Sequence, residues 1–422
     1  MRSRRLRDIA KRMAARAMGT QAAPAHIATS VAETTPCNAR ELAYSGPRLN
    51  ILLPSINAQH YFGGIHTAVQ LYRAMLPQFA QSRIVLIDSA PEPEALSRFA
   101  DHRHVPSDAD DGSTPRQIVA FSDRYGRTLP VQAGDCWLAT SWWTAYAAQR
   151  MAGWQRATFG REGSFAYLIQ DFEPGFYPWS SQYAMALSTY RPDKDFAVFN
   201  TGLLAEHFRS TGLAYSRALE FEPTLNAGLR PKLELARAST EPRKKRIVIY
   251  GRPSTPRNAF ELLCEGLRAW GWSDHCCSEW EVVAPGELLE DLDLGPFKLR
   301  ALGKLGIEEY GDLLATSAIG VSLMISPHPS YPPLEMASFG MGVVTNRYGR
   351  KDLSQWAQGI RSIDSFTPEA IAEALKRECA RWREAEMRPY SLMDAGHPFL
   401  GAGRMEEVGR RLSACLLEGS AP

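Results

Sequence analysis

The chain has 422 residues, of which 45% are hydrophobic and 22% charged, and its formal net charge is +2. This length exceeds what one hydrophobic core usually serves, so we expect two domains of roughly 150 to 200 residues each. So small a net charge excludes a bulk electrostatic attraction to nucleic acid, and no stretch approaches the roughly 18 apolar residues of a membrane-spanning helix.

Seven cysteines are scattered along the chain, and none falls into the paired spacing of a zinc site. Reduced thiols of a cytoplasmic protein are the expected state. His60, His66 and His328 do not form a metal-binding spacing either, and we interpret them as ordinary polar residues of the surface or of the surroundings of a site. The sequence predicts no metal.

The first 48 residues are interpreted as a basic N-terminal segment followed by a linker rich in Ala, Thr and Pro. On a helix, the apolar side chains of residues 2–18, such as Leu6, Ile9 and Met13, would gather on one side with arginines around them. This pattern suits peripheral contact with the anionic inner face of a membrane. A solvated start of the chain and a mitochondrial transit peptide are the alternatives.

Residues 49–222 are predicted to form a first Rossmann-like domain, on the acceptor side. It opens with a buried strand at 50–54, a loop with Gly63 and Gly64, and a helical pattern over 65–75. Short apolar runs follow at 84–87, 136–139, 167–169 and 196–199. Strands that alternate with helices in this way indicate a parallel sheet covered on both faces.

After an interdomain region at 223–244, residues 245–395 repeat this architecture as a second Rossmann-like domain, on the donor side, and 396–422 form a C-terminal helical tail. A strand at 246–250 turns at Gly251 into a helix over about 258–270, and apolar runs follow at 280–283, 298–301, 319–323 and 343–344. The fold class is α/β, with two doubly wound domains facing a central cleft, and ligands bind beyond the carboxyl ends of such strands.

Three segments of the second domain would converge on that cleft. The first, 250–260, leaves a strand and carries Arg252, which can form planar bidentate bonds with phosphate. The second, 303–310, contains a Gly-Lys turn, and the third, 326–342, places Glu335 in the first turn of a helix. Taken singly, such an arginine could form a structural salt bridge, and such a glutamate could complement the helix dipole.

In combination the segments resemble a known family. The order strand-Gly-Arg, Gly-Lys, then Ser-Pro-x-x-x-Tyr-Pro-Pro-Leu-Glu-Met-Ala-x-x-Gly at 326–340 resembles the donor half of GT-B glycosyltransferases of family four. Within them the chain looks most like bacterial rhamnosyltransferases that use dTDP-L-rhamnose. The match covers most of 48–395 and includes a second signature at 168–179, Leu-Ile-Gln-Asp-Phe-Glu-Pro-Gly-Phe-Tyr-Pro-Trp.

The resemblance implies a set of donor-binding residues. Arg252 would be the principal diphosphate ligand, Lys304 a second cation and Arg257 a weaker candidate. Glu335 would hold the ribose hydroxyls, and Tyr331 would border the sugar or the base. Gly63 and Gly64 would let backbone amides approach the donor from the opposite lobe, because glycine has no side chain to intervene.

The sequence also departs from the family pattern. Pro327 stands where the related transferases have the first glutamate of a Glu-x₇-Glu pair, and Gln170 stands where the N-terminal domain often has a histidine. Asp171 and Glu173 therefore become the nearby polar candidates for sugar or acceptor recognition, and Trp179 could stack on an acceptor ring.

These residues suggest transfer of L-rhamnose from dTDP-β-L-rhamnose, with retention, to a hydroxyl of a cell-surface polysaccharide or O-antigen precursor, free or lipid-linked. Arg252, Lys304 and Asp171 are the catalytic candidates, and no metal or other cofactor is required, because cationic side chains can neutralise the leaving diphosphate. One alternative is a GDP- or UDP-sugar donor. Another, motivated by Pro327, is a catalytically silent component that binds sugar nucleotides or glycans.

Overall fold

The computed structural model describes residues 30–418, apart from 45, 62, 110–111, 161–162 and 289. The basic segment at 2–18 lies outside the described residues. The chain divides into two units, Met1–Thr35 and Pro36–Pro422. The described end of the first unit contains a 3₁₀ turn at Ala32–Thr34. Among the helices described, none combines the length and the apolar composition needed to cross a lipid bilayer.

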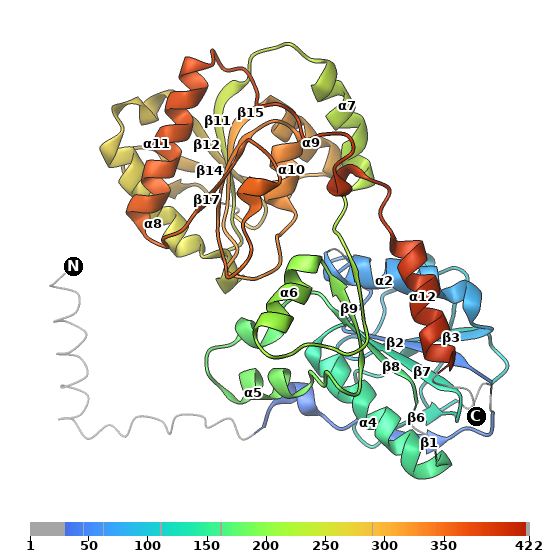
Figure 1. Ribbon diagram of the computed structural model, residues 1–422. Helices are drawn as coiled ribbons and strands as arrows, with labels where there is room; N and C mark the ends of the chain where they lie inside the picture. The colour runs from blue at the N-terminus through green and yellow to red at the C-terminus, as the bar shows by residue number, and fades with distance from the viewer. Residues whose placement is uncertain are drawn as a thin grey trace, which may run out of the picture. The chain divides into compact units, whose positions relative to one another are not determined.

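The N-terminal lobe of the second unit is built on an eight-stranded parallel sheet with the order β10-β9-β8-β7-β2-β3-β5-β4 (Figure 1). Its strands are β2 (Arg48–Leu53), β3 (Gln81–Leu86), β4 (Arg103–His104), β5 (Arg116–Ala120), β7 (Asp135–Ala139), β8 (Phe165–Ile169), β9 (Phe196–Asn200) and β10 (Ala218–Phe221). A separate two-stranded parallel sheet pairs β1 (Asn38–Glu41) with β6 (Thr128–Val131). The central strands β2, β3, β7 and β8 are buried along their whole length, as expected of strands covered on both faces.

Helices cover both faces of this sheet. Successive side chains along a strand point to opposite faces, and the apolar ones on each face pack against helices. Leu49, Ile51 and Leu53 face a core that includes α2 and α12, whereas Leu52 faces a second core with α4 and α6. The helices of this lobe are α2 (Gly64–Met75), α3 (Pro93–Ser97), α4 (Trp142–Phe159), α5 (Ser181–Ser188), α6 (Gly202–Ser210) and α12 (Met405–Glu418), with 3₁₀ turns η2 (Leu76–Gln78) and η3 (Glu173–Phe176). The last helix therefore returns to the first lobe, where it packs beside α2 (Figure 1).

The C-terminal lobe is built on a seven-stranded sheet with the order β13-β14-β12-β11-β15-β16-β17, in which only β13 is antiparallel. Its strands are β11 (Lys244–Tyr250), β12 (Glu281–Pro285), β13 (Leu292–Asp293), β14 (Lys298–Gly303), β15 (Ser317–Ser322), β16 (Gly342–Asn346) and β17 (Ile360–Ile363). The two lobes thus carry two mostly parallel α/β sheets, which confirms the predicted fold class.

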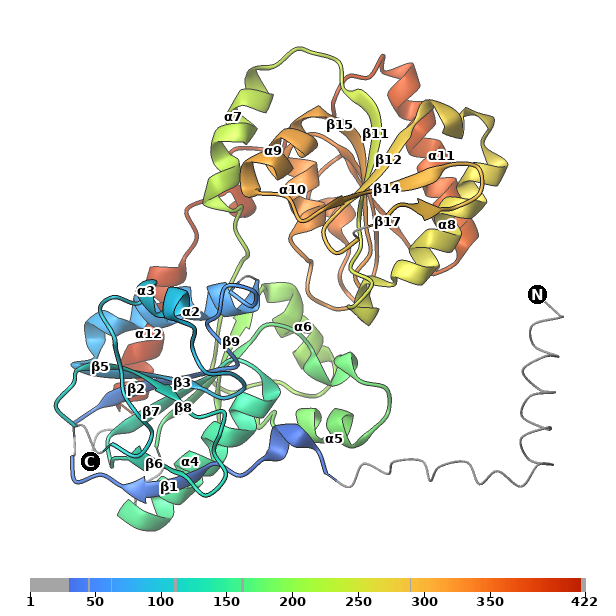
Figure 2. The same cartoon turned by 180° about the vertical axis from the view of Figure 1, so that it is seen from behind.

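Helices again cover both faces of the second sheet. The helices α8 and α11 lie on one face, and α7, α9 and α10 lie on the other (Figure 2). Ile247 and Ile249 pack in the core with α8 and α11, and Val248 packs in the core with α7, α9 and α10. These helices are α7 (Arg230–Ala238), α8 (Phe260–Ser273), α9 (Ile307–Thr316), α10 (Pro332–Ser338) and α11 (Pro368–Glu384), and the 3₁₀ turns are η4 (Ala227–Leu229), η5 (Pro256–Asn258), η6 (His275–Glu279), η7 (Leu353–Gln355) and η8 (Pro398–Leu400). Because β11, β12, β14 and β15 are parallel, their carboxyl ends meet at one edge of the sheet.

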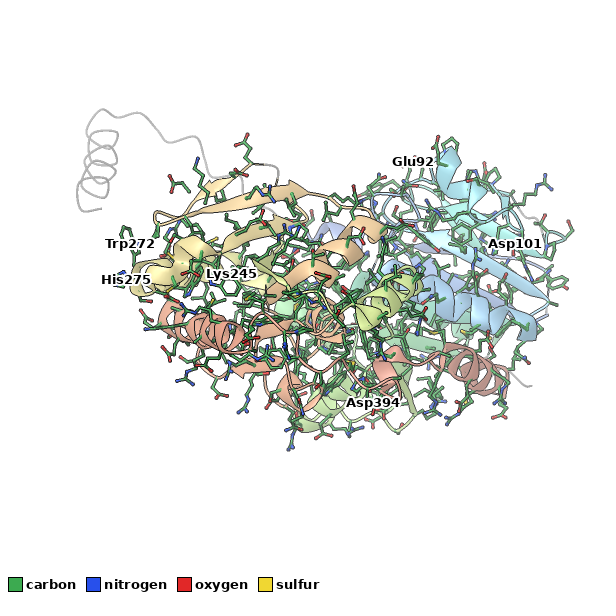
Figure 3. The ribbon with its side chains drawn as sticks, turned by 90° about the horizontal axis from the view of Figure 1, so that it is seen from above. Glu92, Asp101, Lys245, Trp272, His275 and Asp394 are labelled. Atoms are coloured by element: carbon green, nitrogen blue, oxygen red, sulfur yellow. The ribbon has the colours of Figure 1, made fainter. Side chains whose placement is uncertain are left out.

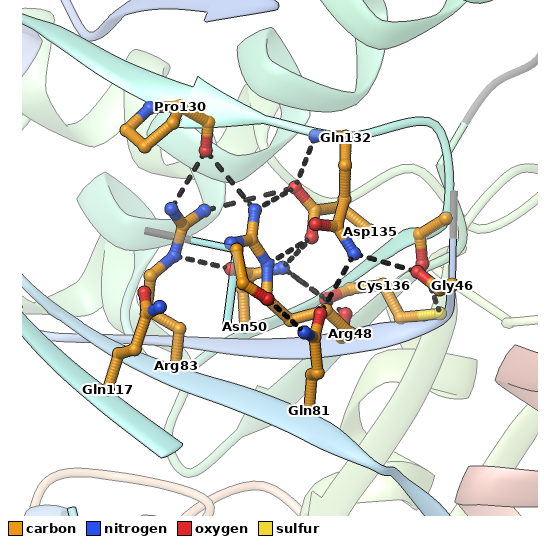
Figure 4. A network of polar contacts seen from close by, with 12 residues as sticks. Gly46, Arg48, Asn50, Gln81, Arg83, Gln117, Pro130, Gln132, Asp135 and Cys136 are labelled. Carbon is orange, nitrogen blue, oxygen red and sulfur yellow. Dashed lines mark hydrogen bonds and ion pairs between the residues drawn. The ribbon is translucent and has the colours of Figure 1, made fainter. Parts of the chain in front are cut away.

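A buried polar network joins the amino ends of β2, β3 and β7 (Figure 4). The Arg48 guanidinium pairs with Asp135 at 2.7 and 2.8 Å, and Asn50 Nδ2 donates to the same carboxylate at 2.8 Å. Arg83 Nε donates to Asn50 Oδ1 at 2.7 Å. Burial alone would raise the pKa of Asp135, but the guanidinium of Arg48 outweighs it and lowers that pKa. This network lies at the opposite edge from the strand ends at which ligands bind, so it stabilises the fold.

Several elements differ from the sequence-based expectation. The strands β5, β10 and β17 were not expected. They are short, and polar residues interrupt their apolar ones, so none forms the continuous apolar run by which the other strands were predicted. The region at 223–244, expected to connect the domains, contains a complete helix, α7, whose Leu233 and Ala236 are buried. The helix α8 begins at Phe260, two residues later than predicted, because the turn η5 precedes it.

Candidate functional site

Arg252 follows the carboxyl end of β11 and is held by an acidic neighbour. Its Nε lies 2.7 Å from Glu287 Oε1, and the same carboxylate accepts hydrogen bonds from the Ser254 amide at 3.1 Å and the Ser254 hydroxyl at 2.8 Å. Burial works against ionisation of Glu287, but the hydrogen bonds from Ser254 and Arg252 outweigh it and lower its pKa. The guanidinium is thus oriented at the strand end while its side chain stays 36% exposed.

Lys304 lies in the turn between β14 and α9 and is exposed. Because β11, β12 and β14 are neighbouring parallel strands, Arg252, Glu287 and Lys304 all follow carboxyl ends at one edge of the sheet. Two cations with an intervening carboxylate are therefore arranged along this edge. Such an edge suits an anionic ligand, since the fixed guanidinium can offer planar hydrogen bonds and the ammonium a compact charge.

Glu335 lies in the first turn of α10, where it is partly buried. Tyr310, from α9, donates a hydrogen bond from its hydroxyl to Glu335 Oε2 at 3.1 Å. Burial raises the pKa of Glu335 to about 7, although the hydrogen bond from Tyr310 acts in the opposite direction. The ionisation of this carboxyl group is therefore expected to change near neutral pH. The sequence assigned no role to Tyr310, because it lies 25 residues before Glu335 and no local pattern indicates their contact.

The loop between β15 and α10 is held by its own polar groups. Ser326 Oγ accepts from the His328 amide at 3.0 Å, and His328 Nδ1 accepts from the Ser330 amide at 3.0 Å. Ser330 has a φ of 68°, a left-handed conformation that this contact supports. His328 is only 9% exposed, and burial lowers its pKa to about 4. Of the two places expected for the histidines, His328 thus lies in the surroundings of the candidate site, whereas His60 and His66 are exposed at the surface.

Lys351 and Asn346, which sequence reasoning did not single out, fix the start of the same loop. Lys351 Nζ donates to the Met324 carbonyl at 2.6 Å, and Asn346 pairs with the Met324 amide at 2.7 Å and its carbonyl at 2.9 Å. Lys351 is only 2% exposed, and burial lowers its pKa to about 7. Lys351 closely follows Arg347 and Arg350. The sequence around it is therefore typical of a solvated surface turn and does not indicate that Lys351 is buried.

In the N-terminal lobe, the loop after β2 meets the loop after β8. Gly63, with a φ of 53°, precedes α2, and Gln170 Nε2 donates to the Gly64 carbonyl at 3.0 Å. A side chain on Gly64 would place its Cβ 3.1 Å from Gln170 Nε2. The absence of a side chain at position 64 thus lets Gln170 approach the backbone there.

Asp171 connects this edge with residues of the C-terminal lobe. Its Oδ1 accepts from the Phe172 amide at 2.8 Å and from the Ser326 hydroxyl, and its Oδ2 lies 3.5 Å from Arg257 Nε. The Arg257 guanidinium also lies 4.4 Å from the centre of the Phe176 ring. A cavity of about 10 Å³, room for about one water molecule, is lined by these groups. Its lining residues are Asp171, Phe172, Gly175, Phe176, Arg257, Ile325, Ser326, Pro327 and Tyr348.

The remaining candidates are placed differently from one another. Glu173 is 4% exposed, and its carboxylate accepts hydrogen bonds from the Trp142 amide, at the start of α4, and from the Tyr167 hydroxyl at 3.1 Å. Burial raises the pKa of Glu173 to about 8. Tyr331 is half-buried, and burial raises its pKa despite hydrogen bonding to Asn200 and Thr67. Trp179, by contrast, is 90% exposed.

The structure therefore brings the sequence-predicted residues together in two groups. Arg252, Lys304 and Glu335 follow strand ends of the C-terminal sheet, and Asp171 is in contact with Arg257. Glu173 lies inside the N-terminal lobe, where its carboxylate accepts hydrogen bonds from Trp142 and Tyr167. In the described ranges, no three His, Cys, Asp or Glu side chains gather in the way a metal ion requires.

Comparison with known proteins identifies a family for both lobes. The N-terminal domain of the WsaF family matches residues 48–202, and the C-terminal domain of that family matches residues 245–376. Over 219 residues the chain is 34% identical to the O-antigen biosynthesis protein RfbC of Myxococcus xanthus. That match covers 51% of this chain but only 16% of RfbC.

Two solved structures have the same fold at low identity. Sucrose-phosphate synthase of Thermosynechococcus elongatus is 11% identical, with a TM-score of 0.50 over 89% of this chain and 96% of that one. HepE of Anabaena, in complex with UDP and glucose, is 10% identical, with a TM-score of 0.52 over 88% and 96% of the respective chains. The fold and the domain matches together define a GT-B glycosyltransferase. Within this class, the chain carries both domains of the WsaF family, in their order.

Proposed function

We propose that the enzyme transfers L-rhamnose from dTDP-β-L-rhamnose, with retention, to a hydroxyl of an O-antigen or other cell-surface polysaccharide precursor. The observation that carries the proposal is the edge of the C-terminal sheet, where Arg252 follows β11, Lys304 follows β14 on the other side of β12, and Glu335 lies in the first turn of α10. A diphosphate needs cations and a ribose needs a hydrogen-bond acceptor, and this edge offers both. The rhamnosyl part rests on the resemblance of the chain, over most of 48–395, to bacterial rhamnosyltransferases.

In this proposal Arg252 is the main ligand of the diphosphate. The bond from Arg252 to Glu287 orients the guanidinium before the donor arrives, so little reorganisation is needed when phosphate oxygens approach it. Lys304 adds a second positive charge from the end of β14, and Gly63 and Gly64 offer backbone amides from the other lobe. Glu335, supported by Tyr310, accepts hydrogen bonds from the ribose hydroxyls.

The transfer replaces one bond at the anomeric carbon by another. The bond between that carbon and the diphosphate oxygen breaks, and a bond to the acceptor oxygen forms. The proton of the acceptor hydroxyl passes to the departing diphosphate, whose developing charge Arg252 and Lys304 stabilise. Asp171, with Gln170 beside it, lies on the acceptor side of this reaction. Its carboxylate also contacts Ser326 and Arg257 of the donor lobe, so it can couple acceptor recognition to the position of the donor loop.

The choice of a 6-deoxy sugar is supported by Pro327. A glutamate at this position would present a charged hydrogen-bond acceptor, whereas Pro327 presents an apolar ring in the wall of the cavity beside Asp171. An apolar wall suits a methyl group better than a hydroxymethyl group, because a buried hydroxyl without a partner is costly. The name of the relative RfbC supports a role in O-antigen synthesis.

We place the reaction in the cytoplasm, and we propose peripheral contact of residues 2–18 with the inner membrane, where a lipid-linked acceptor would be found. The basic and apolar residues of that segment support this location.

A donor panel tests the proposal. Calorimetry would measure binding of dTDP-L-rhamnose, UDP-glucose and GDP-mannose to the full chain, and release of the nucleoside diphosphate would measure turnover. We expect dTDP-L-rhamnose to bind most tightly and to be the donor consumed. Tighter binding and turnover of a UDP- or GDP-sugar would refute the choice of donor. Binding without release of a nucleoside diphosphate, in the presence of membrane extracts that supply acceptors, would refute the catalytic role.

A further inference from the structure

Trp179 is the most exposed large hydrophobic side chain among those described, with 90% of its surface open to solvent. Its indole is stacked on the Tyr183 ring, with the ring centres 5.1 Å apart and an angle of 24° between the planes. Tyr183 therefore lies beside one face of the indole, most of whose surface stays open to solvent. An exposed, preformed aromatic surface of this kind contributes little to the core and needs another explanation.

The exposure of Trp179 does not result from an unanchored segment. On one side, the Tyr177 hydroxyl accepts a hydrogen bond at 2.9 Å from Nε1 of the fully buried Trp142. On the other side, Ser180 caps α5, and its hydroxyl accepts from the Tyr183 amide at 3.3 Å. Trp179 is thus held between two fixed points, and Tyr183 is presented from the first turn of α5.

This aromatic pair follows, along the chain, the segment that lines the cavity at Asp171. The segment of Trp179 follows the carboxyl end of β8, directly after Asp171 and the turn η3. Phe176, three residues earlier, lines the cavity with Asp171, and Tyr348 lines it from the C-terminal lobe. Tyr183 is near enough to Tyr348 to raise the pKa of that residue, after the larger effect of burial. Aromatic rings therefore continue from the cavity to the open indole.

We propose that Trp179 and Tyr183 form a stacking platform for a pyranose ring of the acceptor glycan, next to the sugar that carries the reacting hydroxyl. The apolar C–H face of a pyranose packs on the open face of an aromatic ring, while tyrosine hydroxyls at the rim offer hydrogen bonds to its polar edge. The inference rests on the proposed transfer to a glycan. It adds that the enzyme recognises more than one sugar unit of its acceptor.

Binding is tested without any donor, so that its outcome does not depend on which nucleotide sugar is used. The full chain would be labelled with 5-fluorotryptophan, and the fluorine resonances of Trp179 and Trp272 would be assigned with the variants Trp179→Phe and Trp272→Phe. Trp272, at the end of α8 in the C-terminal lobe (Figure 3), is 74% exposed and serves as the matched control. The probes are the methyl glycoside of an α-L-rhamnotriose and vesicles of phosphatidylglycerol.

We expect the trisaccharide at millimolar concentration to shift the Trp179 resonance and to leave that of Trp272 in place. No shift of Trp179 would overturn the platform. A shift with vesicles and none with the trisaccharide would also overturn it, and would assign the indole to a membrane surface. A shift of Trp179 together with failure of every donor in the panel would leave the platform standing and refute the proposed donor instead.

Kinetics provides an independent measurement once a donor is known. Trp179→Ala is expected to raise the KM for the trisaccharide acceptor about tenfold, and to raise it more than the KM for a monosaccharide acceptor. Trp272→Ala should leave both values unchanged. Circular dichroism would confirm that each variant is folded. Equal effects of Trp179→Ala on the trisaccharide and the monosaccharide would contradict a subsite beyond the reacting sugar.

Discussion

Because burial raises the pKa of Glu335 to about 7, we predict that donor binding depends on pH near neutrality. In the proposed site the ionised carboxylate accepts hydrogen bonds from the ribose, so the ionised fraction sets the apparent affinity. With that pKa, about nine-tenths of the enzyme is ionised at pH 8 and about one-tenth at pH 6. The donor KM should therefore rise by about tenfold from pH 8 to pH 6, which corresponds to about 1.4 kcal/mol.

The assay is the donor KM as a function of pH for three proteins. Glu335→Gln cannot titrate at this position, so its profile should be flat and its KM raised at pH 8. Tyr310→Phe loses the hydrogen bond that favours the carboxylate, so the midpoint of its profile should move to higher pH. The diphosphate of a nucleotide sugar is a diester and does not titrate in this range. A wild-type slope retained in Glu335→Gln would refute the assignment, as would a midpoint that moves down in Tyr310→Phe.

Three further predictions concern charge. Arg252→Ala should lower kcat by roughly 100-fold, because the lost bonds strengthen as charge develops on the diphosphate. The control is Lys245→Ala, which removes a surface lysine paired with Glu279. A near-normal kcat in Arg252→Ala would make this arginine structural. Glu173→Gln should stabilise the protein at pH 8 in urea unfolding. The buried carboxyl has a pKa of about 8 against 4.5 in the unfolded chain, so the native state loses stability as the pH rises through this window, and the gain should shrink toward pH 5. Deletion of residues 2–18 should move the protein from the membrane pellet to the supernatant, and unchanged pelleting would remove the proposed membrane contact.

Much of the fold is predictable because central strands of a doubly wound sheet are continuous apolar runs. The predicted runs at 84–87, 136–139 and 319–323 lie in or overlap β3, β7 and β15, each buried throughout. Edge strands give a weaker signal. In β10, Leu219 and Phe221 are buried but Ala218 and Glu220 are exposed, so the segment does not form a continuous apolar run. The return of α12 to the first lobe depends on contacts with α2, more than 300 residues earlier in the chain.

A site residue could be predicted where its type and its position after a strand determine its chemistry. It could not be predicted where its chemistry depends on a partner that is distant in the sequence. Arg252 could be placed at a strand end from the sequence, but its pairing with Glu287 depends on β11 and β12 lying side by side. Similarly, Lys351 is buried because the chain folds back after β16 and brings its ammonium group to the Met324 carbonyl. Neither partner is close to its counterpart in the sequence.

Glu173 and Glu335 show why residue type and position alone do not decide function. Both follow the carboxyl end of a central parallel strand, both accept a hydrogen bond from a tyrosine hydroxyl, and burial raises the pKa of both. They differ in what else reaches the carboxylate. Glu173 also accepts from the Trp142 amide and is enclosed by its lobe, so its acceptor capacity satisfies the start of α4. The Glu335 carboxylate accepts from the Tyr310 hydroxyl, and its side chain is partly exposed at the edge that holds Arg252 and Lys304. A buried acid whose acceptors are satisfied inside the fold can stabilise it, whereas a partly exposed acid beside a cationic edge can exchange its partners for those of a ligand.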